Sequence, residues 1–166
     1  MNTKSGFAIL YAILMVSIVL TISLSLLNIT FKQIIFSVTG RDSKIAFYAA
    51  DSALQCATYW DVYAVPNTDS PFGYFDLNGD FVQQNVSKQK VTCFGQAEKQ
   101  LVVNLSNPKQ QISSFDIAFN DGSFATIVVA KGVDNNNVTI NSIEASGYNT
   151  SDQNSPRRLQ RTLRAD

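Results

Sequence analysis

Three oxygen-bearing side chains at alternating positions are the first candidates for chemistry in this sequence. Asp76, Asn78 and Asp80 stand in the stretch DLNGD, and this spacing is typical of loops that bind calcium through carboxylate and amide oxygens. However, Phe81 stands where such a loop has a glycine, and Ser87 stands where it has a bidentate acid. The pattern therefore favours a polar turn over a calcium loop, and we predict no metal site.

The composition offers little for catalysis. The sequence has no histidine, so it lacks the side chain that most often serves as general base and as zinc ligand. The nucleophile motif Gly-x-Ser-x-Gly is also absent. The 13 basic and 13 acidic residues cancel, which argues against a nucleic-acid partner. We expect no enzyme and no cofactor, and an anchored hydrolase is the weakest alternative.

The chain begins with an uncharged apolar run from Phe7 to Leu27. A helix of this length spans the roughly 30 Å of a bilayer's hydrocarbon core. A secretory signal peptide has a shorter apolar stretch and a small-x-small cleavage site after it, whereas Asn28, Ile29 and Thr30 follow here. We predict a membrane-spanning helix over 7–28. Its hydroxyl groups are expected to bond back to helix carbonyls: Ser17, Thr21, Ser23 and Ser25.

The helical pattern continues beyond the span, over 29–60. The stretch SKIAFYAADSALQCATYW contains no proline, so one rod that is broken or bent only near Gly40 reaches Trp60. Small residues recur at helical spacing and share one face: Ala46, Ala49, Ala50, Ala53, Cys56 and Ala57. We expect a sheet or a helix to pack closely on this face. The alternative is that the alanines reflect helix propensity alone.

The remainder reads as a loop over 61–80 and an antiparallel β-sheet head over 81–166. The loop is rich in proline, glycine, asparagine and aspartate. Four to six strands are predicted from segments rich in β-branched and aromatic residues: DFVQQNV, KQKVTCF, KQLVVNLS, SSFDIAF, SFATIVVAKG and NVTINSIEASG. Asp121-Gly122 lies between Phe119 and Phe124 and predicts a hairpin turn.

The last segment, SPRRLQRTLRAD, has two interpretations. As an edge strand it would alternate Leu159 and Thr162 with arginines that face solvent. A short basic helix is the alternative. The arginines could also bind an anionic surface, although a solvated strand or tail is the usual meaning of such a run: Arg157, Arg158, Arg161 and Arg164.

The amino-terminal part of the chain resembles the type IV pilin and pseudopilin family. The residues that carry the resemblance are Lys4-Ser5-Gly6 before Phe7, the span from Ala8 to Leu27, and AFYAADSAL farther along the helix. The resemblance implies an α+β fold, in which a long N-terminal helix, membrane-spanning in its first half, packs on a small antiparallel sheet. It ends near Trp60.

The resemblance also implies a processing site. In that family a prepilin peptidase cuts after the glycine and methylates the exposed phenylalanine amine, so 1–6 would be a leader peptide and Gly6 and Phe7 the processing pair. Phe7, Ala8 and Tyr11 would belong to the helix that drives assembly. Tyr11 stands where most major pilins have a glutamate, and this departure points to a minor subunit.

Cys56 and Cys93 are the only cysteines. Cys56 lies on the small-residue face of the helix and Cys93 in a predicted strand, so a disulfide would join helix to sheet. An extracytoplasmic head permits this bond. Two buried free thiols are the alternative.

These observations predict a non-enzymatic subunit of an extracytoplasmic filament. It would be a single-pass protein of the cytoplasmic membrane before assembly into a pilus or pseudopilus. Its partners would be the lipid bilayer, other pilin subunits, the prepilin peptidase and the assembly machinery. The alternative is a single-pass anchored binding domain that never polymerises.

Overall fold

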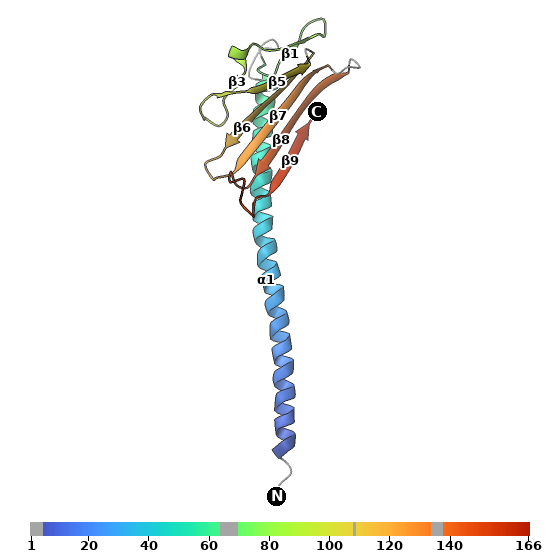
Figure 1. The fold of residues 1–166 in the computed structure, drawn as a ribbon, viewed down its shortest axis with the longest axis vertical. Coiled ribbons are helices and arrows are strands. Elements are labelled where there is room, and N and C mark those ends of the chain that lie inside the picture. Colours follow the sequence, from blue (N-terminus) through green and yellow to red (C-terminus); the bar gives the residue numbers. More distant parts are fainter. Residues whose placement is uncertain (1–4, 64–69, 108, 134–137) are drawn as a thin grey trace. The chain divides into compact units, whose positions relative to one another are not determined.

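The computed structural model describes residues 5–63, 70–107, 109–133 and 138–166. Its first element is one helix, α1 (Ser5–Thr58), which is followed by a π-helical turn, Tyr59–Tyr63 (Figure 1). The helix continues without a break through Gly40, the one position where the sequence suggested that it could break or bend. A glycine inside a helix costs only about 1 kcal/mol, which the hydrogen bonds of a long helix outweigh. Of the predicted leader, residues 1–4 lie outside the described residues, and Gly6 belongs to the first turn of α1.

The chain forms two compact units, one up to Arg41 and one from Asp42 to Asp166, which we call the head unit. All described residues of the first unit belong to α1. Its predicted back-bonds are confirmed: the hydroxyls of Ser17, Thr21, Ser23 and Ser25 donate to carbonyls three or four residues earlier. The helix thereby satisfies these hydroxyls without water, as a bilayer would require.

The head unit combines the end of α1 with antiparallel strands, so the predicted α+β fold is confirmed. Its main sheet has five strands in the order β5-β6-β7-β8-β9 (Figure 1). Their bounds are β5 Val102–Asn107, β6 Gln110–Ala118, β7 Phe124–Val133, β8 Thr139–Tyr148 and β9 Gln160–Ala165. Outside the main sheet, the head unit has two short antiparallel strand pairs: β1 Tyr74–Phe75 with β2 Phe81–Val82, and β3 Lys90–Val91 with β4 Lys99–Gln100.

The region before the main sheet differs from the prediction. The expected loop over 61–80 contains β1, and the first two expected strands shrink to β2 and β3, which lie outside the main sheet. Between them, a 3₁₀ turn covers Val86–Lys88. Glutamine side chains stabilise this region in place of the backbone hydrogen bonds between paired strands. Gln84 Nε2 donates to Ser70 O at 3.2 Å, and Gln89 Nε2 donates to Gln84 O at 2.7 Å. Glutamine amides thus supply hydrogen bonds that regular strands would otherwise make.

The small-residue face of α1 packs on the sheet, as expected. Ala46, Ala50, Ala53 and Ala57 are all fully buried. The contact is closest at Gly147 in β8, where an added Cβ would lie 2.1 Å from Ala46 O and 2.4 Å from Ala50 N. The helix backbone therefore rests directly on the strand. Aliphatic and aromatic residues of β6, β7 and β8 complete the core: Phe115, Ile117, Ile127, Val129 and Ile143.

The predicted hairpin between β6 and β7 is confirmed. Phe119 N donates to Ser123 O at 2.9 Å, and Gly122 N donates to Phe119 O at 3.1 Å. Gly122 has φ +84°, a left-handed value that glycine adopts without strain. The pair Asp121-Gly122 therefore makes the turn for the predicted reason.

The final segment forms the edge strand β9, not a helix, but its residues are sorted differently from the prediction. Thr162 faces outward with Ser146, and Leu163, not Thr162, is the partly buried residue. Arg161 is exposed, as expected, but it also contacts α1. It pairs with Gly147 in β8, and its Nε donates to Ser43 Oγ on α1 at 2.9 Å.

Candidate functional site

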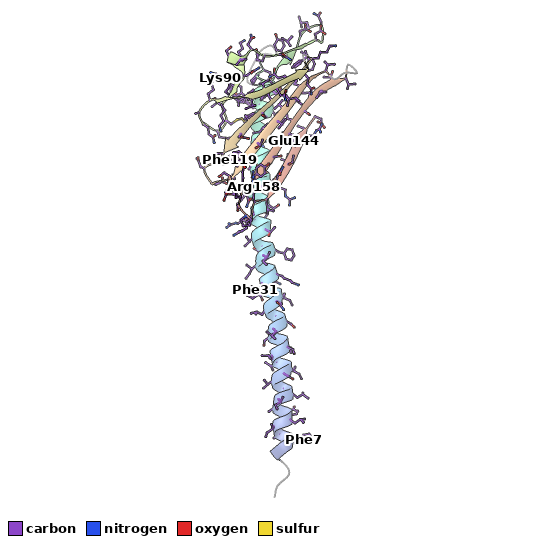
Figure 2. All side chains as sticks on the ribbon, viewed as in Figure 1. Phe7, Phe31, Lys90, Phe119, Glu144 and Arg158 are labelled. Carbon is purple, nitrogen blue, oxygen red and sulfur yellow. A yellow bond between two sulfur atoms is a disulfide. The ribbon has the colours of Figure 1, made fainter. Side chains whose placement is uncertain are left out.

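The first candidate site is the apolar part of α1. It contains an 18-residue window with a mean hydropathy of 2.6, none of which is buried, so by length and composition this helix is a candidate membrane anchor. Phe7 is 77% exposed and Tyr11 55% exposed, and they lie one turn apart on the same face. Ala8 is exposed as well. Figure 2 shows Phe7 and Phe31 projecting from the helix.

Large exposed apolar side chains continue past the predicted span. Phe31, Ile34, Ile35 and Phe36 are between 55% and 75% exposed. Lys32 and Gln33 interrupt them, so this stretch is less apolar than the span itself. The exposed apolar surface therefore extends about three turns farther along α1 than the uncharged run alone predicts.

A disulfide joins Cys56 to Cys93 across a sequence separation of 37, with the Cα atoms 6.0 Å apart. Cys56 lies on α1, as expected. Cys93 lies just beyond β3 rather than within a strand, at the start of a turn closed by Gln96 N donating to Cys93 O. Phe94 in this turn has φ +54°, a value that is uncommon for a bulky residue. The disulfide thus fixes a strained turn to the helix.

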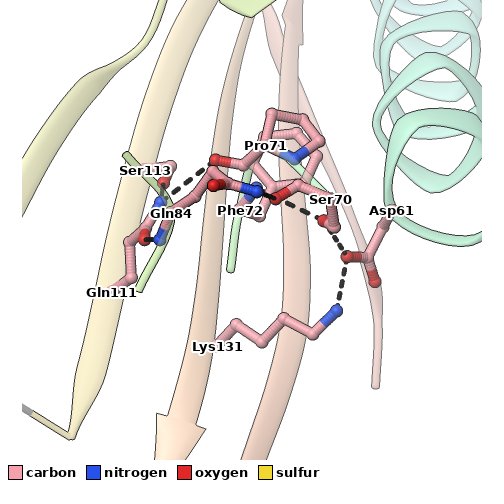
Figure 3. A network of polar contacts seen from close by, with 8 residues as sticks. All are labelled: Asp61, Ser70, Pro71, Phe72, Gln84, Gln111, Ser113 and Lys131. Carbon is pink, nitrogen blue, oxygen red and sulfur yellow. Dashed lines mark hydrogen bonds and ion pairs between the residues drawn. The ribbon is translucent and has the colours of Figure 1, made fainter. Parts of the chain in front are cut away.

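A buried ion pair lies where α1 ends. Lys131 Nζ lies 2.6 Å from Asp61 Oδ1, and the two side chains are only 10% and 4% exposed. Ser70 Oγ donates to the same oxygen at 3.0 Å (Figure 3). Removing either charge would leave the other buried without a partner, which is strongly unfavourable. This pair therefore fixes the π-helical turn to β7.

Gln111 is the centre of a second polar cluster, also fully buried. Its Nε2 donates to Pro71 O at 3.1 Å and to Ser113 Oγ at 3.0 Å, and its Oε1 accepts from Gln84 N (Figure 3). With its hydrogen bonds made inside the protein, this amide holds the segment after α1 against β6. The hydrogen bonds of this cluster join separate parts of the head unit, so we describe it as an architectural cluster.

Sequence reasoning missed these two clusters, although one signal was present. In β7 the buried positions alternate through Ala125, Ile127 and Val129, and the next position in that register is Lys131. A period of two therefore assigns a lysine to the core face. Such a lysine needs a buried acid, but the sequence does not indicate that Asp61 is that acid.

The stretch DLNGD, which was considered above as a calcium loop, forms a turn held by hydrogen bonds from backbone amides to an aspartate side chain. Asp76 Oδ1 accepts hydrogen bonds from Asn78 N at 2.9 Å and from Asp80 N at 2.8 Å. This closes the β1–β2 hairpin in the way an aspartate side chain commonly stabilises a turn. Within the described part of the chain, no group of three or more His, Cys, Asp or Glu side chains is arranged to hold a metal.

No family model, curated protein or solved structure matches this chain.

Proposed function

We propose that this protein is a minor subunit, a pilin or pseudopilin, of an extracytoplasmic type IV-like filament. One observation carries the proposal: a single helix is buried on the sheet at its carboxyl end and has an entirely exposed apolar surface from Phe7 to Phe36. The sheet buries only the carboxyl end of the helix, so this exposed surface needs another apolar environment in which it can be buried.

The energetic argument concerns the exposed half of α1. Each large apolar side chain that leaves water stabilises the buried state by about 1.5–3 kcal/mol, and the helix has many of them. A bilayer can provide this burial for a stored subunit, and the helices of neighbouring subunits can provide it in a filament. Because lipid and packed helices are both apolar, moving between them has a small net free-energy change.

The head unit fits the same proposal. An extracytoplasmic location would keep the Cys56–Cys93 disulfide oxidised. No cofactor and no catalytic activity enter the proposal. The head unit would form filament surface, and the amino terminus of α1 would start at Phe7 after the leader is removed.

Tyr11 supports a minor role. An acid at this position could pair with the terminal ammonium of a neighbour and so favour addition of each new subunit, because an unpaired charge in an apolar core is costly. Tyrosine is neutral near pH 7 and offers ring packing and one hydrogen bond instead. We propose that this subunit sits at a filament tip or is rare along the filament.

Processing provides the test of this proposal. In cells with an active prepilin peptidase, intact-mass analysis of the membrane-extracted protein should find a chain that begins at a methylated Phe7. Gly6→Leu should block the cut, whereas the control Gly40→Leu should leave it unchanged. A mature chain that still begins at Met1 would favour the anchored, non-polymerising domain.

Stoichiometry provides the second test. Quantitative mass spectrometry of sheared filaments should find this chain well below the predominant subunit. If it is the main repeating subunit, the minor role is wrong, although the filament role remains.

A further inference from the structure

A small groove lies on one flank of the head unit, between α1 and the β6–β7 turn. It has a volume of about 150 Å³. The helix contributes Tyr48, Ala49 and Ser52, and the turn contributes Phe119, Asp121 and Ser123. One water needs only about 10–15 Å³ of such volume, so the groove has room for several waters or for one long side chain.

The turn-side wall of the groove is held in place. On the turn side, the ring of Phe119 packs against that of Phe94, with centroids 5.6 Å apart. The backbone of the turn is fixed by Ser151 N, which donates to Gly122 O at 3.1 Å. On the helix side, Ala49 is buried and Tyr48 is 65% exposed. The turn-side wall, which is already fixed, loses little conformational entropy when a side chain enters the groove.

One end of the groove carries a stable negative charge. Asp121 Oδ1 accepts hydrogen bonds from Ser123 Oγ at 2.6 Å and from Ser123 N at 3.0 Å. These bonds, from the hydroxyl first and then from the backbone, lower the pKa of Asp121 below its ordinary value of 3.8. Among the described residues, no lysine or arginine forms an ion pair with Asp121. The carboxylate is therefore charged and has no cationic partner in the part of the chain that the structure describes.

We propose that this groove binds a lysine or arginine side chain of a neighbouring filament subunit. The aliphatic stem would lie over Ala49, between the rings of Tyr48 and Phe119, and the cationic group would reach Asp121. This inference rests on the proposed function, because it takes the neighbour from the filament.

Charge, shape and chemistry favour this occupant. Long basic side chains place an apolar stem on apolar surface and keep the charged end beside polar groups. Aromatic faces attract cations, which adds to the attraction of the carboxylate. A purely apolar side chain would leave Asp121 and Ser52 without new partners, and an acidic one would be repelled by Asp121.

Photo-crosslinking in cells tests the inference on the full-length chain. p-Benzoylphenylalanine replaces Tyr48, which keeps an aromatic ring at the groove wall. After irradiation, filaments are sheared and the crosslinked peptide is mapped by mass spectrometry. We expect a peptide of another filament subunit in which the crosslink lies beside a lysine or arginine. Asp121→Asn should lower the yield by about two- to fivefold, the upper part of the range for losing one exposed ion pair.

Asp116→Asn is the matched control, because Asp116 is exposed on β6, away from the groove, and the yield should not change. Three results would overturn the groove assignment: an equal yield in Asp121→Asn, a crosslink to lipid, or a peptide without a nearby cation. A chain that is missing from filaments but still gives an Asp121-dependent crosslink to a basic residue of another membrane protein would instead refute the proposed function and the identity of the partner.

Discussion

Gly147→Ala should weaken the contact between α1 and the sheet. The new Cβ would lie 2.1 Å from Ala46 O and 2.4 Å from Ala50 N, whereas real Cβ contacts stay beyond about 3.0 Å. The helix must therefore move away by close to 1 Å. Backbone atoms cannot turn aside as a flexible side chain can, so we expect the upper end of the usual overpacking effect, about 3 kcal/mol.

The shift would also loosen the alanine face. A gap of 0.5–1 Å removes about a quarter to a half of each dispersion contact, and Ala46, Ala50, Ala53 and Ala57 all lie on this face. A loss of about 3 kcal/mol corresponds to a decrease of roughly 10 °C in the melting temperature for a unit of this size.

Trp60 provides the assay for Gly147→Ala. It is the single tryptophan, and its Nε1 donates to Thr92 O at 2.9 Å, so its fluorescence reports on the head unit. Denaturant unfolding of the full chain in detergent should show the loss. Gly40→Ala is the control, because nothing lies within 4 Å of its added Cβ and alanine favours a helix. If Gly147→Ala stays within about 0.5 kcal/mol of the native protein, the close contact at this position is wrong.

The same assay reads out three further changes. Cys56→Ser or Cys93→Ser should each destabilise the head unit by about 4 kcal/mol, because the disulfide closes a loop of 37 residues, and reduction of the native protein should match them. Lys131→Met should cost about 3–5 kcal/mol by leaving Asp61 buried and unpaired, and adding Asp61→Leu should recover part of this loss. Asp121→Asn should lower the stability of the head unit at pH 7, because the pKa of Asp121 is lower in the folded state and its charged form therefore stabilises that state at pH values above the unfolded pKa. The difference in stability between the variant and the native protein should vanish as the pH falls below about 3.8 and through the folded pKa. A difference that persists at lower pH would contradict this.

Several features of the fold could be predicted from the sequence because they depend on neighbours along the chain. The apolar run over 7–27 and the alanine spacing predict one long helix with a packing face. Asp121-Gly122 predicts its turn because the backbone there needs a positive φ. Segments rich in β-branched and aromatic residues predict β6, β7 and β8 close to their observed positions.

Predictions were less accurate where the chain needs distant partners. KQKVTCF has the composition of a strand, yet only Lys90–Val91 is paired, because the next residues turn to meet α1 at the disulfide. Arg161 is exposed, as expected, but the sequence did not indicate that it would also donate a hydrogen bond to Ser43 on α1. Contacts with α1, which is distant in the sequence, decided both outcomes, and composition does not specify them.

The sequence by itself determined the elements: an apolar helix with a small-residue face, a tight hairpin and a set of amphipathic strands. Their patterns are local, since a helix repeats every 3.6 residues and a strand every two. Only the tertiary structure decided that Asp61 pairs with Lys131 and that Tyr48 shares a groove with Asp121. Asp61 and Lys131 are 70 residues apart in the sequence. Both pairs meet because strand order and register bring β7 and the β6–β7 turn to α1. Long-range contacts of this kind depend on the packing of the whole core, which no single stretch of sequence encodes.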